Sequence, residues 1–158
     1  MTEFSQASIA RSDSTVDELL KMHKAALEQR FRDSPAGEIP KGRGKGTVIF
    51  APGTFLARFV ALLAYVVAWR GKVFDGRSGD LLNIVSPFGI RAIRASVYAD
   101  PSWIDGRECV VLDYSKTSRV AHWIRDEIRE VAPGVFLGQV FWARSKVLMF
   151  ALEFPPTG

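Results

Sequence analysis

The chain has 158 residues, the ordinary length of one domain with its own hydrophobic core. Hydrophobic residues make up 47% of it and aromatic residues 11%, which excludes a disordered chain and suits a β-rich core or an apolar cavity. Its single cysteine excludes an intrachain disulfide and a cysteine-based zinc or iron-sulfur site. No secretory signal pattern opens the sequence, so we expect a cytoplasmic protein.

The net charge of +4 is unevenly distributed along the sequence. Between Lys41 and Arg94, Asp75 and Asp80 are the only acids among many basic residues. Such a stretch is either a solvated basic surface or a face for an anionic partner. No RNA-binding, KH or zinc-finger motif accompanies it, so nucleic-acid binding is not expected.

Residues 1–14 are predicted to form a flexible N-terminus, followed by an amphipathic helix over 15–32. Apolar side chains recur in the helix at spacings of three and four residues, and Asp13 or Ser14 can cap it. Repeated Gly and Pro residues predict a linker over 33–46. We expect the helix to pack on the outside or the end of the domain that follows.

Two further segments have helical character. The apolar stretch Phe55–Trp69 is too short to span a membrane, which needs about 20 residues, and is predicted to be a short buried helix. The apolar spacing of Ser115–Val131 fits a helix, but its last residues, before Pro133, also fit one arm of a hairpin. We predict a short helix over 118–124 followed by a strand.

Short runs rich in Val, Ile, Phe and Tyr dominate residues 47–154, and brief Gly- and Pro-containing turns separate them. Six or more such strands with few helices favour a closed or nearly closed barrel. The predicted fold is therefore mainly β (α+β): an antiparallel barrel with the N-terminal amphipathic helix and one short buried helix, in a single domain over 15–158. The predicted strands are Thr47–Phe50, Lys72–Phe74, Leu81–Val85, Ile90–Tyr98, Glu108–Tyr114, Val135–Ala143 and Val147–Phe154.

Several motifs of this β-rich part resemble a known family. Trp69–Phe74 is similar to the W-x-G-K-x-F element of the GXWXG family of domains of unknown function. The G-x-W-x-G motif itself is absent, and Gly42–Gly46 stands in its approximate place. Further short matches follow in a similar order at Ala95–Tyr98, Ile104–Gly106, Leu137–Gly138 and Phe150–Leu152. More broadly, the pattern resembles lipocalin-like, calycin-type barrels. This resemblance implies a barrel that holds a small hydrophobic molecule.

Polar residues gather around the strand predicted after residue 124. Glu127 and Arg129 would share one face of that strand, and Asp126 would take the other. If Glu127 and Arg129 face inward, a carboxylate of shifted pKa and a cation meet in an apolar interior, which suits proton transfer or the binding of a carboxylate or enolate. The alternative is a structural salt bridge or a solvated outer face. The candidate catalytic residues are Glu127 or Asp126 as base and Tyr114 as proton donor.

Aromatic residues on or beside the strands could line a cavity, with ordinary core packing as the alternative. Arg129, Tyr98 or Tyr114 is expected to anchor the polar end of a guest. No metal or cofactor is expected, since His23 and His122 belong to no ligand motif and the single cysteine fits a packed thiol. The candidate ligand-binding residues are Arg129, Tyr98, Trp103, Trp123, Trp142 and Asp113.

The predicted function is the binding of a small hydrophobic or amphipathic, lipid-like molecule in the barrel cavity. The alternative is a cofactor-independent acid/base enzyme (an isomerase, cyclase or dehydratase) that acts on such a molecule in the same cavity. A third hypothesis is an interaction protein, in which Phe55–Trp69 or the N-terminal helix packs against another chain or forms a homodimer.

Overall fold

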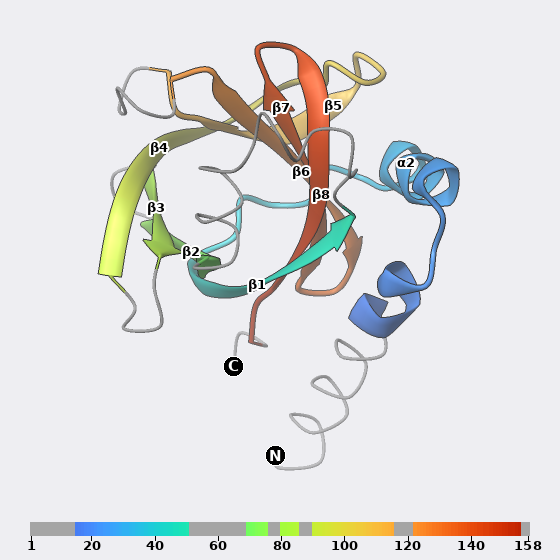
Figure 1. The fold of residues 1–158 in the computed structure, drawn as a ribbon, viewed down its shortest axis with the longest axis horizontal. Coiled ribbons are helices and arrows are strands. Elements are labelled where there is room, and N and C mark those ends of the chain that lie inside the picture. Colours follow the sequence, from blue (N-terminus) through green and yellow to red (C-terminus); the bar gives the residue numbers. More distant parts are fainter. Residues whose placement is uncertain (1–14, 51–68, 76–79, 86–89, 116–121, 156–158) are drawn as a thin grey trace.

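The computed structural model describes residues 15–50, 69–75, 80–85, 90–115 and 122–155, most of which lie in β-strands (Figure 1). Apart from Trp69, the predicted buried helix Phe55–Trp69 lies outside the described residues, and Trp69 itself begins a strand. Helix α2 spans Lys24–Asp33. The strands are β1 (Gly42–Phe50), β2 (Trp69–Asp75), β3 (Asp80–Val85), β4 (Ile90–Pro101), β5 (Glu108–Asp113), β6 (Ile124–Ala132), β7 (Val135–Trp142) and β8 (Ser145–Glu153).

The eight strands pair in sequence order, each antiparallel to the next. β1 also pairs with β8, from Lys45 opposite Glu153 to Phe50 opposite Met149, so the strand order is that of a closed barrel. Consecutive strands are spatial neighbours, which is why short connections can join them. The predicted mainly β, antiparallel architecture is confirmed.

β1 begins at Gly42, inside the stretch predicted to be a linker, so irregular chain is confined to 34–41. Gly44 lies directly against the ring of Phe154, and a Cβ added there would be 2.6 Å from Phe154 Cζ. Glycine within a strand often marks such a close approach. The glycine-rich stretch is therefore barrel wall, and the prediction of a linker up to residue 46 was wrong at its end.

The predicted helix over 15–32 is two helical segments, 15–20 and α2, with a break at 21–23. The backbone of His23 is extended (φ −71°, ψ 158°) and ends the first segment before α2 starts. Figure 1 shows both segments along the same side of the barrel. The break lets each segment turn its apolar side to the curved wall, and both contribute to one apolar cluster through Val16, Leu19, Leu27 and Phe31.

The ambiguous segment resolves as the strand β6, which pairs with β5 on one edge and β7 on the other. Residues 122 and 123 form a turn and residue 124 begins β6, so the last three residues of the predicted helix over 118–124 are not helical. Residues 118–121 of that helix lie outside the described residues. Hydrogen bonds on two strand edges outweigh the helical spacing of the apolar residues, because tertiary pairing overrides weak local preference.

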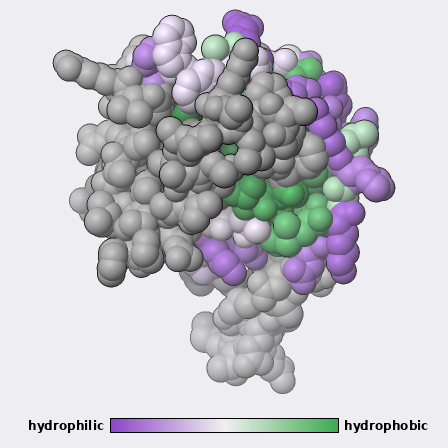
Figure 2. All heavy atoms as spheres, in the orientation of Figure 1, coloured by the Kyte–Doolittle hydropathy of each residue, from purple (hydrophilic) through white to green (hydrophobic). Residues whose placement is uncertain are grey.

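Two apolar clusters lie on opposite faces of the wall. The interior cluster draws on β2 and β4–β8 and lies inside the barrel, whereas the helix-facing cluster joins the two helical segments to β5, β7 and β8 from outside. On the face seen in Figure 2, hydrophobic side chains gather in one area bordered by hydrophilic ones. The interior cluster is Phe74, Ala95, Val97, Val110, Leu112, Tyr114, Ile128, Phe136, Val140, Val147, Phe150 and Leu152; the helix-facing cluster is Val16, Leu19, Leu27, Phe31, Cys109, Val111, Val135, Leu137, Met149 and Ala151.

Phenylalanine rings close one end of the interior. Phe154 follows β8 directly and packs edge-on against Phe74 and Phe136, with ring centroids 5.5 and 5.7 Å apart. Its backbone N–H donates to the carbonyl of Gly134 in the β6–β7 turn (2.8 Å). The β5–β6 connection lies at the other end of β6, so this aromatic end and that connection are at opposite ends of the barrel.

Candidate functional site

Strand β6 carries polar residues on both of its faces. Asp126 pairs with Leu112 and Val140, both members of the interior cluster, and directly paired residues project from the same face of a sheet. Glu127 and Arg129 occupy the alternate positions and therefore face outward, toward the helix-facing cluster. The inward orientation on which their predicted role in a cavity depended is not found.

Asp126 and Tyr114 form a carboxylate–phenol pair in the interior. The hydroxyl of Tyr114 donates to Asp126 Oδ2 at 3.1 Å, and Tyr114 and Asp126 are 2% and 3% exposed. Tyr114 directly follows β5 and Asp126 is the third residue of β6, so the pair lies toward the end opposite the phenylalanine rings. A carboxylate held by a phenol in an apolar setting can accept a proton or a hydrogen bond from a guest, and this pair is our candidate site.

Glu127 is fully buried on the outer face and is held by several donors. Its Oε2 accepts from Ser102 Oγ–H at 2.5 Å, and its Oε1 accepts from the backbone N–H of Trp103 at 2.7 Å. Arg125 adds two hydrogen bonds to Oε1, at 3.1 and 3.2 Å. The carboxylate thus joins the β4–β5 loop to β6, which is a structural role and not that of the predicted base.

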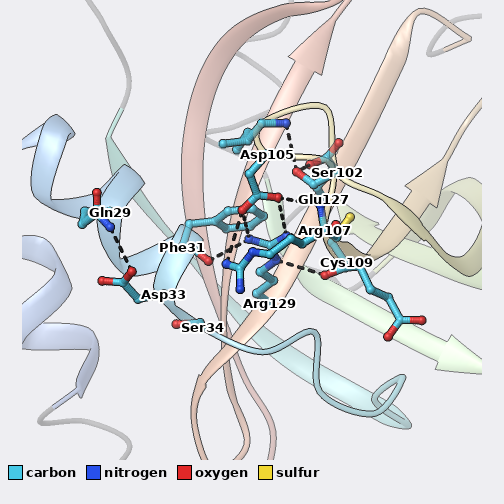
Figure 3. Close-up of polar contacts among 12 residues, drawn as sticks. Gln29, Phe31, Asp33, Ser34, Ser102, Asp105, Arg107, Cys109, Glu127 and Arg129 are labelled. Atoms are coloured by element: carbon cyan, nitrogen blue, oxygen red, sulfur yellow. Dashed lines mark hydrogen bonds and ion pairs between the residues drawn. The ribbon is translucent and has the colours of Figure 1, made fainter.

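Arg129 is also fully buried, and all five of its N–H groups have partners (Figure 3). Its two terminal nitrogens grip the carboxylate of Asp105 at 2.7 Å each, while other donors reach the carbonyls of Phe31, Arg107 and Glu108 at 3.1–3.2 Å. The guanidinium lies over the Phe31 ring, 4.6 Å from its centroid. Arg129 therefore ties α2 and the β4–β5 loop to the barrel, and no donor is left over for a ligand.

Asp105 shows the electrostatic effect of this arrangement. The hydrogen bonds from Arg129 hold the pKa of the Asp105 carboxyl well below its ordinary value of 3.8, against the opposing effect of burial. Paired and bidentate contacts of this kind are stronger than neutral hydrogen bonds. Asp105, Ser102 and Phe31 were not predicted as site residues from the sequence, although the turn Ile104–Gly106 resembles a family motif.

Tyr98 and Asp113 form a second tyrosine–aspartate pair, this one on the outer face. The Tyr98 hydroxyl donates to Asp113 Oδ2 at 2.8 Å, and Tyr98 is 36% exposed. Burial, followed by the hydrogen bond and charge of Asp113, raises the pKa of Tyr98 to about 12. The neighbours Val97 and Leu112 belong to the interior cluster, so strand alternation directs this pair away from the interior.

The candidate tryptophans do not line one common wall. Trp103 lies in the β4–β5 loop, with the guanidinium carbons of Arg125 and Arg144 4.3 and 4.4 Å from its ring centroid. Trp123 is 56% exposed in the turn before β6. Trp142 pairs with Ile124, a residue packed against the interior cluster, so of the three it alone shares the interior face, at the end of β7.

Residue types that could support other chemistry are placed elsewhere. Among the described residues, no three His, Cys, Asp or Glu side chains are arranged to hold a metal ion. The Cys109 thiol is buried in the helix-facing cluster, and burial raises its pKa to about 12, which suppresses the reactive thiolate. Within the described part of the chain, no helix has the length and apolar character needed to cross a membrane.

Comparison with known proteins gives one similar fold. No protein-family model and no curated protein matches the chain. A solved structure described as a protein from Thermomonospora curvata superposes with a TM-score of 0.65, covering 93% of this chain and 97% of that one at 16% sequence identity. At this identity the likeness shows the fold alone, and it agrees with an antiparallel, barrel-like architecture.

Proposed function

We propose that this lipocalin-like barrel binds a small hydrophobic or amphipathic molecule in its interior, with the Tyr114–Asp126 pair at the polar end of the guest. The observation that carries the proposal is a buried carboxylate on the interior face of β6, hydrogen-bonded to a buried phenol and paired in the sheet with two members of the interior cluster. Burying a carboxylate costs free energy, so a role in orienting a guest accounts for its position. A polar group near one end of an apolar barrel interior is the arrangement that orients a guest.

The two tyrosine–aspartate pairs supply a matched test. Tyr114→Phe removes the interior hydroxyl, and Tyr98→Phe makes the same chemical change on the outer face. Binding is measured by titrating the neutral fluorophore N-phenyl-1-naphthylamine into the full chain and following its fluorescence. Thermal unfolding checks that each variant is folded. We expect Tyr114→Phe to weaken binding by roughly tenfold, the loss of about 1.4 kcal/mol, and Tyr98→Phe to leave it unchanged.

Two results would count against the proposal. The first is the absence of saturable binding of the fluorophore or of any long-chain compound by the wild-type protein. The second is an equal effect of Tyr114→Phe and Tyr98→Phe, which would locate the binding outside the interior. Native mass spectrometry of protein purified from its own host adds an independent readout, because a retained molecule identifies the ligand directly.

A cofactor-independent acid/base enzyme is the second candidate, and the same pair favours it. Asp126 could take a proton from a bound molecule while Tyr114 donates one, as in an isomerisation or a dehydration. The test is the recovery of the retained molecule after incubation with the protein in deuterated water. Deuterium at a carbon position, lost in Asp126→Asn, supports turnover; recovery of the molecule unchanged supports binding alone.

A further inference from the structure

We infer that the surface around the β7–β8 turn docks onto an anionic lipid membrane, with exposed indoles entering the interface and an arginine binding lipid phosphate. This indole surface consists of Trp103, Trp123, Trp142 and Arg144. Docking through these exposed side chains goes beyond the proposed function, since it does not require a guest in the interior.

Three exposed tryptophans gather at this surface. Trp103, Trp123 and Trp142 are 38%, 56% and 36% exposed. The backbone N–H of Ala143, the residue after Trp142, donates to the carbonyl of Trp123 at 3.0 Å. Trp103 reaches the same place from the β4–β5 loop, because its ring packs edge-on against Phe141 on β7, with centroids 5.2 Å apart. Exposed aromatic residues that cluster mark an interaction surface, and tryptophan suits a membrane interface because it joins an apolar ring to a polar N–H.

The β7–β8 turn places Arg144 in an unfavourable backbone conformation. Ala143 and Arg144 both have positive φ angles, 45° and 74°, between the paired residues Trp142 and Ser145. Two-residue turns with this backbone favour Asn and Gly, because a Cβ is strained at positive φ. In Figure 1 the turn lies at the top of the barrel, away from the C-terminus. Strain of this kind is concentrated where a side chain must be held in one position, and here that side chain is Arg144.

Arg144 is a cation without an acidic partner in the described part of the chain. Its guanidinium carbon lies 4.4 Å from the centroid of the Trp103 ring, and it forms no hydrogen bond or ion pair there. Arg125 lies over the same ring at 4.3 Å but donates to Glu127 and to the carbonyl of Pro101. A guanidinium stacked on a ring keeps the N–H groups along its edge available to an oxyanion, and its planar fork fits a phosphate. The surface therefore offers a positive charge among indoles, which complements an anionic headgroup layer.

Single-stranded nucleic acid fits the same surface less well. Bases bind such proteins by stacking on open aromatic faces. The guanidinium groups of Arg125 and Arg144 lie over the Trp103 ring, and the ring centroid of His122 is 4.2 Å from that of Trp123. These contacts occupy ring surface that a base would need. A membrane interface requires exposed indoles and a nearby cation, and both are present.

The experiment measures binding of the full chain to lipid vesicles. Vesicles of phosphatidylcholine alone are compared with vesicles that also contain about 30% phosphatidylglycerol, an anionic lipid. Co-sedimentation gives the affinity, and a blue shift of tryptophan emission reports entry of indoles into the membrane. We expect the anionic vesicles to bind more tightly. Trp123→Ala and Arg144→Gln should each weaken that binding by about fivefold, equivalent to the roughly 1 kcal/mol that one basic residue contributes near an anionic surface.

Two control variants make similar changes elsewhere. Arg43→Gln removes the same charge from an exposed position of β1, beside Gly44, which contacts Phe154 at the aromatic end of the barrel. Leu20→Ala removes an apolar side chain that is 47% exposed in the first helical segment. Both variants should bind anionic vesicles as the wild type does.

Three results would overturn the inference. The first is the absence of vesicle binding by the wild type. The second is an equal weakening in Arg43→Gln and Arg144→Gln, which would reduce the binding to a general attraction of a basic chain. The third is self-association or oligonucleotide binding that Trp123→Ala abolishes while vesicle binding is unaffected, because the indole surface would then serve a second copy of the chain or a nucleic acid.

Discussion

Replacement of Arg129 by Met tests how the helices are held to the barrel. Arg129 uses all five of its N–H groups, two of them on Asp105 at 2.7 Å. Met fills a similar volume but leaves the Asp105 carboxylate and three carbonyls without these donors. Removing one partner of a buried ion pair costs about 3–5 kcal/mol, a large part of the 5–15 kcal/mol by which a typical domain is stable.

Urea unfolding followed by tryptophan fluorescence measures this loss. With a dependence on urea of about 2 kcal/mol per M, typical of small proteins, the midpoint should fall by roughly 2 M. Arg144→Met is the matched control, because Arg144 is an exposed arginine that stacks on Trp103, and its loss should cost less than about 1 kcal/mol.

Two further variants distinguish the contribution of the ion pair to stability from that of side-chain packing. Arg129→Lys keeps the charge but cannot form two parallel hydrogen bonds to a carboxylate. Its free energy of unfolding should therefore lie between those of the wild type and Arg129→Met. Asp105→Asn combined with Arg129→Met should cost less than the sum of the two single changes, because the partners are in contact. A loss below about 1 kcal/mol in Arg129→Met would refute the argument that this residue fastens α2 to β6.

Three other predictions follow from single contacts. Arg129 lowers the pKa of Asp105, so the stabilisation by this carboxylate is complete above the ordinary pKa of 3.8 and is lost as the pH falls below that value. The stability of Asp105→Asn should therefore depend less on pH in acid unfolding than that of the wild type. An identical pH dependence of the two proteins would contradict this prediction. Gly138→Ala would place a Cβ against the buried ring of Phe150 and should lower the free energy of unfolding by about 1–3 kcal/mol. Thermal unfolding measures this loss, and an unchanged melting temperature would contradict the prediction. The Cys109 thiol, buried and with a pKa raised to about 12, should react with a thiol reagent in urea but not in buffer at neutral pH, so rapid labelling of the folded protein would disprove its burial.

The strands were well predicted where β-branched and aromatic runs alternate with turn residues. β3, β5, β7 and β8 begin and end within one or two residues of their predicted bounds, because turn chemistry is local and visible in the sequence. The start of β1 was missed because glycines there serve the close approach of Phe154, a contact from the far end of the chain. Long-range contacts of this kind leave no local signal.

For the candidate site, the sequence determined which residues share a strand face, and tertiary structure decided which face is inside. Alternation separated Asp126 from Glu127 and Arg129 correctly. However, the central residues of β6 are buried on both faces, because the two helical segments and the β4–β5 loop cover the outer wall. Hydrophobic alternation identifies the inner face of a strand when the outer face is exposed to water. The outer face of β6 is covered, so only the fold assigned Asp126 to the interior and the ion pairs to the exterior.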